Sequence, residues 1–477
     1  MTENYDLVVL GAGSAGLTAA IVAGRVGARV LLLDREKTGG DCTHHGCVPS
    51  KALIRCARAA HGVRHAARFG VGAAPTQVDF GRVHDFVHGA IATVASGETP
   101  EKLRAHGVET VFGGGRFLSP TSLRAGEREV RADRAIVAVG SRASAPPIPG
   151  LAEAGFLDHV ALFELRELPA RLAVIGGGPI GVEMGQALAR LGSKVTILEA
   201  GPRILPRDDA DLAGVLLDLL KLELDIVPGA KVTGVGRAGG AKTVRYEVAG
   251  EATTLECDEV LVAVGRKPNL EGLGLDAAGV QTTPRGITVD AHLRTTARNI
   301  WAAGDCTGSY QFTHFAQVQA QVATRNALFR GKQKFDEPFV PWTTFADPEL
   351  AHVGLREEDA RASHPEARTY RMPYAELDRA IVEGETGGLA KVVCDRHGRI
   401  LGASLLGPRA GEAISEFVIA MKQGIRLQDL AGMIHAYPTM NRIVSDLGNR
   451  RFFQEGISDL TRRLFGKFRG APPAASA

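Results

Sequence analysis

The sequence predicts an α/β protein built from two similar Rossmann-like units and a C-terminal α+β domain. Three observations predict this fold class. A strand-loop-helix-strand pattern occurs twice, at 7–34 and 172–199. Each of these units is followed by an apolar strand that runs into glycine, at 136–141 and 261–266. From about residue 335 the pattern changes to amphipathic strands and helices, as expected of a separate mixed domain.

Length and composition limit the function classes. A chain of 477 residues is too long for one hydrophobic core, so two or three domains are expected. Hydrophobic residues at 45% and charged residues at 23% are typical of a globular protein and exclude a disordered or fibrous one. The net charge of +3 produces no strong field, so no nucleic-acid partner is expected.

Signals in the sequence predict a cytoplasmic protein. The first six residues, 1–6, lack the basic region and cleavage site of a secretion signal. The apolar stretches are too short or too interrupted to span a bilayer. Of the six cysteines, only Cys42 and Cys47 lie close together, which excludes an extracellular disulfide framework and indicates one specialised pair.

Both repeated units carry a Gly-x-Gly-x-x-Gly fingerprint directly after the first strand. The first glycine allows a tight turn, the second lets a pyrophosphate approach the backbone, and the third seats the helix on the sheet. An acid at the end of the second strand is placed to accept a hydrogen bond from a ribose hydroxyl. Two such units in the same register predict two bound dinucleotides. The residues are Gly11, Gly13, Gly16 and Asp34 in the first unit and Gly176, Gly178, Gly181 and Glu199 in the second.

The second acid also predicts which nicotinamide cofactor is used. A carboxylate at Glu199 would repel a 2′-phosphate, so NAD(H) is favoured over NADP(H). Arg203 lies nearby in the sequence and is the one feature that would favour the phosphorylated cofactor.

The segment from Gly39 to Lys51 predicts a redox-active cysteine pair. Pro49 suits the first turn of a helix, so Cys47 is expected at a helix N-terminus, where backbone amides stabilise a thiolate. An unperturbed thiol has a pKa of about 8.5, and Lys51 would add to the activation.

A zinc site is the alternative interpretation of this segment, because it holds four soft or borderline ligands, Cys42, His44, His45 and Cys47. A helix that begins near Cys47 would keep them from converging on one ion. The redox pair is therefore favoured, and no bound metal is expected. Two cysteines that only pack in a core would not be surrounded by glycines and histidines.

Taken together, these motifs resemble the class I pyridine nucleotide-disulfide oxidoreductases, which include dihydrolipoamide dehydrogenase, glutathione reductase and mercuric reductase. The resemblance covers nearly the whole chain. It rests on both fingerprints, on Cys-x4-Cys-Val-Pro-Ser-Lys, on Ala-Ala-Gly-Asp ending at Asp305, and on 344–354, which resembles the start of a dimerisation domain. The resemblance implies an FAD-binding domain at 1–150 with 281–335 returning to it, an NAD-binding domain at 151–280, a dimerisation domain at 336–465 and a flexible tail at 466–477.

The resemblance also implies a path for electrons. NAD(P)H would reduce FAD, which would open a Cys42–Cys47 disulfide. Cys47 would face the flavin, Cys42 would attack a disulfide or dithiol substrate, and Lys51 would pair with Glu183 beside the flavin. The other residues implied at the cofactors are Gly140, Ser141, Gly265 and Asp305.

One departure from the family pattern affects proton transfer. Where disulfide reductases of the family carry His-Pro-Thr-x-x-Glu, this chain has Tyr437 and Arg442 in place of the histidine and the glutamate. A phenol with a reference pKa of about 10 is a poor proton shuttle at neutral pH. In a homodimer, Tyr437 is expected to come from the partner chain. The histidines considered as substitutes are His44, His45 and His435.

Three functions remain open from the sequence. The first is a dihydrolipoamide dehydrogenase-like enzyme. The second is a metal-ion reductase similar to mercuric reductase, because that enzyme carries a tyrosine at this position and a thiolate pair suits soft metal ions. The sequence lacks the paired C-terminal cysteines of mercuric reductase and its preceding metal-carrier domain. The third is a flavin-bound docking protein with vestigial chemistry, which the intact cysteine pair argues against.

The C-terminal helix is basic, with arginines and lysines interspersed among leucines and phenylalanines. Such a helix can lie on an anionic membrane. A solvated face is the more common reason for this pattern, so membrane contact is not expected. The basic residues are Arg450, Arg451, Arg462, Arg463, Lys467 and Arg469.

Overall fold

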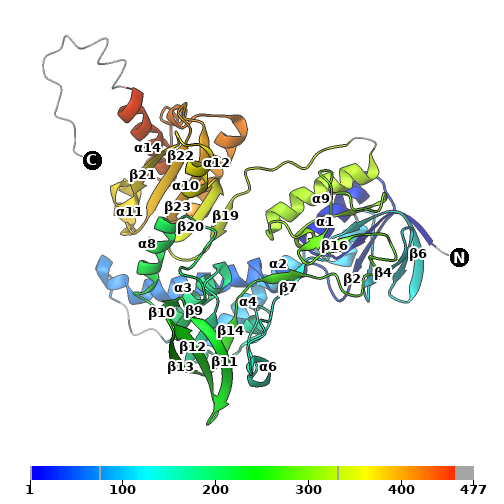
Figure 1. Cartoon of the computed structure of the whole chain (residues 1–477), viewed down its shortest axis with the longest axis horizontal. Coiled ribbons are helices and arrows are strands. Elements are labelled where there is room, and N and C mark those ends of the chain that lie inside the picture. Colours follow the sequence, from blue (N-terminus) through cyan, green and yellow to red (C-terminus); the bar gives the residue numbers. More distant parts are fainter. Residues whose placement is uncertain (1–2, 73, 75–76, 330–331, 457–477) are drawn as a thin grey trace. The chain divides into compact units, whose positions relative to one another are not determined.

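The structure is a computed structural model that describes residues 3–72, 74, 77–329 and 332–456 (Figure 1). The chain divides into two compact units. The first contains Met1–Pro202 and Glu223–Glu337, and the second contains Arg203–Leu222 and Pro338–Ala477. The predicted tail at 466–477 and the basic residues from Arg462 onward lie outside the described residues.

A seven-stranded sheet forms the core of the N-terminal part of the first unit. Its order is β3-β2-β1-β6-β5-β4, with β18 beside β6. The strands β3, β2, β1, β6 and β18 run parallel, whereas β4 and β5 are antiparallel additions. Their bounds are β1 Glu3–Leu10, β2 Val30–Asp34, β3 Val108–Phe112, β4 Gly115–Ser119, β5 Ser122–Ala125, β6 Arg128–Val137 and β18 Ile300–Ala302.

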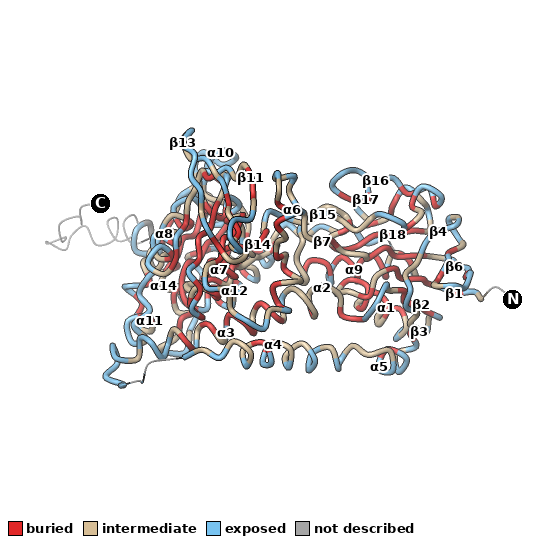
Figure 2. Tube along the Cα trace, turned by 90° about the horizontal axis from the view of Figure 1, so that it is seen from below, coloured by how far each residue is buried: buried red, intermediate tan, exposed pale blue. Residues whose placement is uncertain are grey.

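Helices α1 (Ser14–Arg25) and α9 (Thr313–Leu328) share one buried cluster on this sheet. Alanines on both helices, such as Ala20 and Ala320, are fully buried, and their small side chains allow close packing. Figure 2 shows the central strands β1, β2 and β18 buried along most of their length. Because α1 starts just after β1, the first fingerprint lies at the carboxyl edge of the parallel strands, where α/β sheets bind ligands.

A second, four-stranded parallel sheet has the order β10-β9-β8-β14. Its unit β8-α7-β9 repeats β1-α1-β2, so the internal repeat predicted from the sequence is confirmed. A three-stranded antiparallel sheet, β11-β12-β13, follows β10. The bounds are β8 Arg171–Ile175, α7 Pro179–Leu191, β9 Lys194–Glu199, β10 Asp225–Pro228, β11 Lys231–Ala238, β12 Ala241–Val248, β13 Glu251–Cys257 and β14 Glu259–Val262.

Two long helices, α3 (Cys47–Arg64) and α4 (Phe80–Ala95), complete the first unit together with short elements. Helix α3 packs against α7 and α4, whereas α4 buries only His84 and Val87 and is otherwise partly or fully exposed (Figure 2). The short elements are α2 Gly40–His44, α5 Pro100–Arg104, β7 Ser141–Ala143, α6 Leu151–Ala154, the 3₁₀ helix η2 Ala161–Glu164, β15 Arg266–Pro268, β16 Thr282–Thr283 and β17 Gly286–Ile287.

The second unit is a five-stranded antiparallel sheet with helices on both faces. The order is β19-β20-β23-β22-β21, and β22 and β23 pair as an antiparallel hairpin. Helices α12 and α14 bury one face. The bounds are α8 Ala210–Leu220, β19 Trp342–Thr344, β20 Glu349–Gly354, α10 Glu357–Ser363, β21 Arg368–Pro373, α11 Asp378–Glu383, β22 Leu389–Cys394, β23 Ile400–Gly407, α12 Ala410–Gln423, α13 Leu427–Leu430 and α14 Arg442–Arg451.

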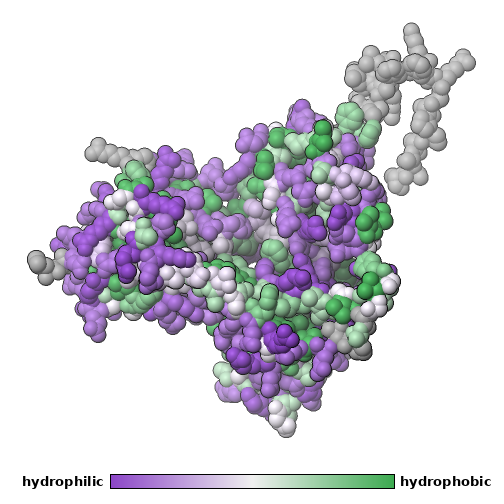
Figure 3. Space-filling model, turned by 180° about the vertical axis from the view of Figure 1, so that it is seen from behind, coloured by the Kyte–Doolittle hydropathy of each residue, from purple (hydrophilic) through white to green (hydrophobic). Residues whose placement is uncertain are grey.

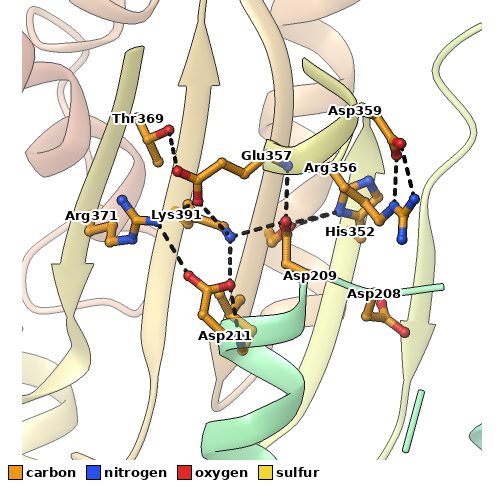
Figure 4. Close-up of polar contacts among 12 residues, drawn as sticks. Asp208, Asp209, Asp211, His352, Arg356, Glu357, Asp359, Thr369, Arg371 and Lys391 are labelled. Atoms are coloured by element: carbon orange, nitrogen blue, oxygen red, sulfur yellow. Dashed lines mark hydrogen bonds and ion pairs between the residues drawn. The ribbon is translucent and has the colours of Figure 1, made fainter. Parts of the chain in front are cut away.

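A buried polar cluster lies on the opposite face of this sheet (Figure 4). His352, Ser404 and Lys391 are register partners on β20, β23 and β22. Ser404 donates to Asp209 at 2.5 Å, and Asp209 is the residue immediately before α8. Burial lowers the pKa of His352, so its ring is neutral at pH 7. Carboxylates at the start of α8 thus meet polar side chains from the middle of the sheet.

Lys391 is the cation at the centre of this cluster, and its side chain is only 2% exposed. Its Nζ lies 3.0 Å from Asp209, 2.6 Å from Asp211 and 3.1 Å from Glu357. A buried charge is costly unless it is paired and hydrogen-bonded. The three carboxylates meet that requirement.

The surface is mixed in character. On the face drawn in Figure 3, hydrophilic residues predominate and hydrophobic ones are scattered among them. Within the described part of the chain, no helix is both long enough and apolar enough to cross a membrane.

Candidate active site

The cysteine pair lies where α2 ends and α3 begins. Helix α3 starts at Cys47, as the sequence predicts. The two sulfurs are not bonded to each other here, as in the reduced form of the pair; Cys47 is exposed and Cys42 is partly buried. The hydrogen bond from Cys42, helped by Thr313, lowers the pKa of Cys47 to about 6. The same contact, together with burial, raises the pKa of Cys42. At neutral pH, Cys47 is therefore the thiolate and Cys42 keeps its proton.

Thr313 is the second polar partner of the reactive sulfur. Its Oγ1 lies 3.3 Å from Cys47 Sγ. It is the first residue of α9, which packs against α1. The packing of two helices on the first sheet thus fixes the position of this hydroxyl.

Lys51 and Glu183 form an ion pair beside the cysteines. Lys51 Nζ lies 2.9 Å from Glu183 Oε2, and the Glu183 side chain is only 8% exposed. Lys51 follows Cys47 by one helical turn, and its charge contributes to the lowered pKa of Cys47. Since Lys51 is on α3 and Glu183 is on α7, the pair depends on the packing of these two helices.

A network of five polar side chains extends from the residue before Cys42. Asp41 contacts His159 and Arg266, each at 2.8 Å. Arg266 donates to Ser141 Oγ at 2.9 Å, and Ser141 donates to Asp305 at 2.5 Å. Burial raises the pKa of Asp41, but the hydrogen bond with His159 and the charge of Arg266 lower it on balance. Burial raises the pKa of Asp305. The cysteine segment and Asp305 are thereby connected through Arg266.

The first and third glycines of each fingerprint are required by the protein itself. A Cβ on Gly11 would lie 2.4 Å from the carbonyl oxygen of Ala138, and one on Gly16 would lie 1.7 Å from that of Gly11. The second unit repeats this crowding at Gly176 and Gly181. Side chains at these positions would disrupt the turn or separate helix from sheet.

The second glycine of each fingerprint is open. A Cβ on Gly178 would have no heavy atom within 4 Å, and one on Gly13 would meet only Gly40 Cα, at 3.8 Å. Because the protein leaves this space unfilled, it can accept the pyrophosphate of a dinucleotide. Gly140 and Gly265 adopt left-handed φ angles of 65° and 131°, also with nothing within 4 Å of a Cβ.

The acid of each unit fastens its own glycine loop. Asp34 accepts a hydrogen bond from the amide of Ala12 at 2.7 Å. Glu199 accepts equivalent bonds from Gly177 and Gly201, both at 2.6 Å. Arg203, in the second unit, donates to the backbone carbonyls of its own turn, those of Leu205, Pro206 and Asp208.

Tyr437 and His435 both belong to the second unit. Tyr437 is 63% exposed and donates to Asp378 at 2.9 Å, which raises its pKa. It is thus even less suited to proton transfer at neutral pH than an ordinary phenol. His435 Nε2 lies 2.9 Å from Glu416 Oε2, forming a histidine-carboxylate pair.

The other two histidines considered from the sequence lie in α2 and just after it. His44 Nε2 lies 2.7 Å from the carbonyl oxygen of Thr38. Burial lowers the pKa of His45, which disfavours its protonated form.

Sequence reasoning missed four residues of this site. Asp41 precedes Cys42 and Arg266 follows Gly265, so adjacency to a motif could have identified these two. Thr313 and His159 carry no such signal, because only the folded chain brings them to the network.

Comparisons with known proteins agree with this geometry. Residues 5–320 match the family model described as pyridine nucleotide-disulphide oxidoreductase, and 340–447 match its dimerisation domain. The chain is 33% identical to a mercuric reductase of Bacillus cereus over 92% of its length and 70% of that protein. It is 35% identical to a dihydrolipoyl dehydrogenase of Thermus scotoductus, over 92% of this chain and 95% of that one.

A solved structure gives the same result. The Cu(II) complex of the HOCl-induced flavoprotein disulfide reductase RclA from Escherichia coli superposes with a TM-score of 0.84 at 32% identity, covering 92% of this chain and 98% of that one. The match to a dimerisation domain supports homodimer formation. The chain therefore belongs to the pyridine nucleotide-disulphide oxidoreductase family and is an FAD-dependent enzyme that uses a pyridine nucleotide.

Proposed function

We propose that this enzyme passes electrons from NADH through FAD to the Cys42–Cys47 pair and then to a disulfide substrate, as in a dihydrolipoamide dehydrogenase-like reaction. The observation that carries the proposal is the opposite pKa shift of the two thiols, lowered at Cys47 and raised at Cys42. One cysteine is thus suited to contact the flavin as a thiolate. The other keeps a proton until substrate arrives.

Both dinucleotides fit the residues present. The first fingerprint with Asp34, Ser141 and Asp305 would hold FAD, and the second fingerprint with Glu199 would hold the nicotinamide nucleotide. When bound, FAD would accept a hydride from the nicotinamide nucleotide and pass the electron pair to the disulfide. Lys51 would lie beside the flavin ring. Its ion pair with Glu183 would balance its charge there.

The exchange with substrate balances as two thiol-disulfide steps. Cys42 loses its proton to a base, its sulfur attacks the substrate disulfide, and one substrate thiolate leaves and takes up a proton. Cys47 thiolate then attacks the Cys42 sulfur, which closes the Cys42–Cys47 disulfide and releases the second substrate thiolate. We assign the base to His435 of the opposite chain of a homodimer, because its contact with Glu416 at 2.9 Å orients the imidazole.

A second candidate is reduction of a soft metal ion. It is favoured by the thiolate-thiol pair itself, by Tyr437, and by the similarity to mercuric reductases at 31–33% identity. The docking protein with vestigial chemistry loses support, because the family shown is an enzyme family. Cytoplasmic location stays a prediction from the sequence.

Steady-state NADH oxidation with matched acceptors tests the proposal. Lipoamide should be reduced with a higher specificity constant than Hg²⁺ presented with excess thiol. His435→Gln should lower turnover with lipoamide but leave NADH-dependent reduction of a direct flavin acceptor, such as ferricyanide, unchanged. Faster turnover with Hg²⁺ would select the metal-ion reductase instead.

The nucleotide preference is a further prediction. NADH should have at least about a tenfold higher specificity constant than NADPH, because Glu199 repels a 2′-phosphate. Glu199→Gln should reduce that preference, mainly through the KM for NADH. Arg203→Ala is the matched control and should leave the preference unchanged, since its guanidinium is engaged by its own turn. A parent enzyme that prefers NADPH contradicts the assignment.

The Cys47 thiolate should also give the enzyme an absorbance that depends on pH. A lowered pKa means that the Cys47 thiolate is present above pH 6 and is lost as the pH falls through about 6. In enzyme reduced by one equivalent of NADH, the long-wavelength absorbance from thiolate and flavin should fade over that range. Thr313→Val should move the midpoint upward, because it removes a hydrogen bond to the thiolate. A midpoint near 8.5, the ordinary thiol value, would show that Cys47 is not activated.

A further inference from the structure

Helix α4 carries two histidines that meet a glutamate from a different segment. His84 and His88 lie four residues apart, one helical turn, and their rings stack at a centroid distance of 4.0 Å. Glu164 ends the 3₁₀ helix η2, which packs against α4. Each of the three side chains offers a ligand atom within 4.8 Å of the other two.

Hydrogen bonds to the two rings provide a second observation. The Nε2 atom of His88 lies 3.0 Å from the carbonyl oxygen of Phe163. The Nδ1 atom of His84 lies 3.3 Å from a carboxylate oxygen of Asp85. Histidines that bind metals commonly donate one ring N–H to a carbonyl or carboxylate, which orients the ring and leaves the other nitrogen for the ion. Both rings here have such a partner.

From this arrangement we propose that His84, His88 and Glu164 bind a divalent transition cation of the zinc type. Two imidazole nitrogens and one carboxylate oxygen suit Zn²⁺, whereas Mg²⁺ and Ca²⁺ prefer oxygen ligands alone. Three protein ligands leave the fourth tetrahedral position to water. Ligand atoms around zinc lie roughly 3.3 Å apart, so the exposed Glu164 side chain has to turn inward by up to about 1.5 Å from the 4.8 Å limit.

The charges around the site favour a cation. Glu164 and Asp85 contribute two carboxylates, and Arg166 is a positive group that lies 3.7 Å from Asp85. His84 is only 7% exposed in its side chain, so one ligand is held rigidly. A bound ion would tie η2 to α4. The ion would take no part in the cysteine chemistry, so the proposal of this site does not depend on the proposed function.

The chain offers its own control on α3. His61 and His65 are also four residues apart, and their rings also stack at 4.0 Å. Among the described residues, however, this pair does not belong to a group of three ligand atoms that are close enough to hold an ion. His65→Ala therefore removes a stacked histidine of the same spacing without removing a ligand of the proposed site.

Zinc binding by the FAD-loaded, full-length protein tests the site. Cys42→Ser and Cys47→Ser are introduced together, so that the active-site thiols cannot bind Zn²⁺. This double variant is the background protein into which each further substitution is made. Calorimetric titration should show one Zn²⁺ per chain whose Kd rises at least about tenfold in His88→Ala and in Glu164→Gln. His65→Ala should bind as the background protein does. Zn²⁺ should raise the Tm of the background protein but not that of Glu164→Gln.

Several outcomes would overturn the proposal. Unchanged Zn²⁺ affinity in both His88→Ala and Glu164→Gln would show that these side chains hold no ion. Equal weakening by His65→Ala would show binding to surface histidines in general. Because His84 is buried, its replacement could unfold α4 locally, so the test rests on the more accessible His88 and Glu164. Their circular dichroism and Tm without zinc should match those of the background protein.

Discussion

Replacement of Cys47 by serine should stop electron flow at the flavin while FAD stays bound. The serine hydroxyl cannot form a disulfide with Cys42, so no dithiol is available to reduce a substrate. Turnover with a disulfide should fall on the order of 10⁴-fold or more, as expected when a nucleophile is removed. Anaerobic titration with NADH should consume two hydride equivalents in the parent enzyme, one for FAD and one for the disulfide. The variant should consume one.

Cys56→Ser is the control for this variant. Cys56 lies on the same helix, α3, and is also partly buried, but burial raises the pKa of its thiol. This variant should still take up two equivalents and keep parental turnover. A parent enzyme that accepts only one equivalent, with both thiols already free before NADH is added, would contradict the disulfide mechanism.

Lys391→Met should destabilise the second unit by about 3–5 kcal/mol, because it leaves Asp209, Asp211 and Glu357 without their shared buried cation. Methionine has a similar volume, so lost packing contributes little. Urea unfolding of the full FAD-loaded chain, followed by Trp342 fluorescence in a Trp301→Phe background, reports on this unit. Protein concentration is held fixed, because dimerisation shifts the apparent stability.

Arg426→Met gives the matched comparison in the same unit. Arg426 pairs with Asp429 at the surface, with side chains 54% and 44% exposed, and its removal should leave the urea midpoint unchanged.

The effect of Lys391→Met should also depend on pH. Burial raises the pKa of Asp211, but the bond from Lys391 lowers it on balance. The stabilisation is therefore present at neutral pH and is lost as the pH falls through the acid range. An unchanged midpoint at pH 7 would mean that water or other groups replace the cation.

The elements that the sequence predicts correctly are those with a local physical cause. The glycines at Gly16 and Gly181 follow from packing that only glycine allows, because a Cβ there would clash with the carbonyl oxygen of the glycine five residues earlier. The start of α3 at Cys47 follows from Pro49. In these cases the responsible residues lie within a few positions of one another, so one sequence is enough.

The parts that sequence reasoning missed depend on contacts between distant segments. The sequence interpretation credited Lys51 and the helix end with activating Cys47, whereas the hydrogen bond from Cys42 is the larger cause and Thr313, 266 residues away, also contributes. The Lys391 cluster was missed for a related reason. A lysine in an amphipathic strand is normally assigned to solvent, and only the docking of α8 on that face buries it.

The path of the chain through α8 has a consequence for how the protein is made. Arg203–Leu222 belongs to the second unit but is flanked on both sides by the first, so the chain passes between the units three times. During synthesis, α8 emerges more than a hundred residues before the sheet that covers it. Until β22 has been synthesised, Asp209 and Asp211 lack Lys391 as their partner, so the second unit cannot close around α8 before that point. A fragment that begins at Pro338 would carry Lys391 without two of its three carboxylates and without the helix that covers it, so a single cut should yield a sheet that exposes the Lys391 face to water.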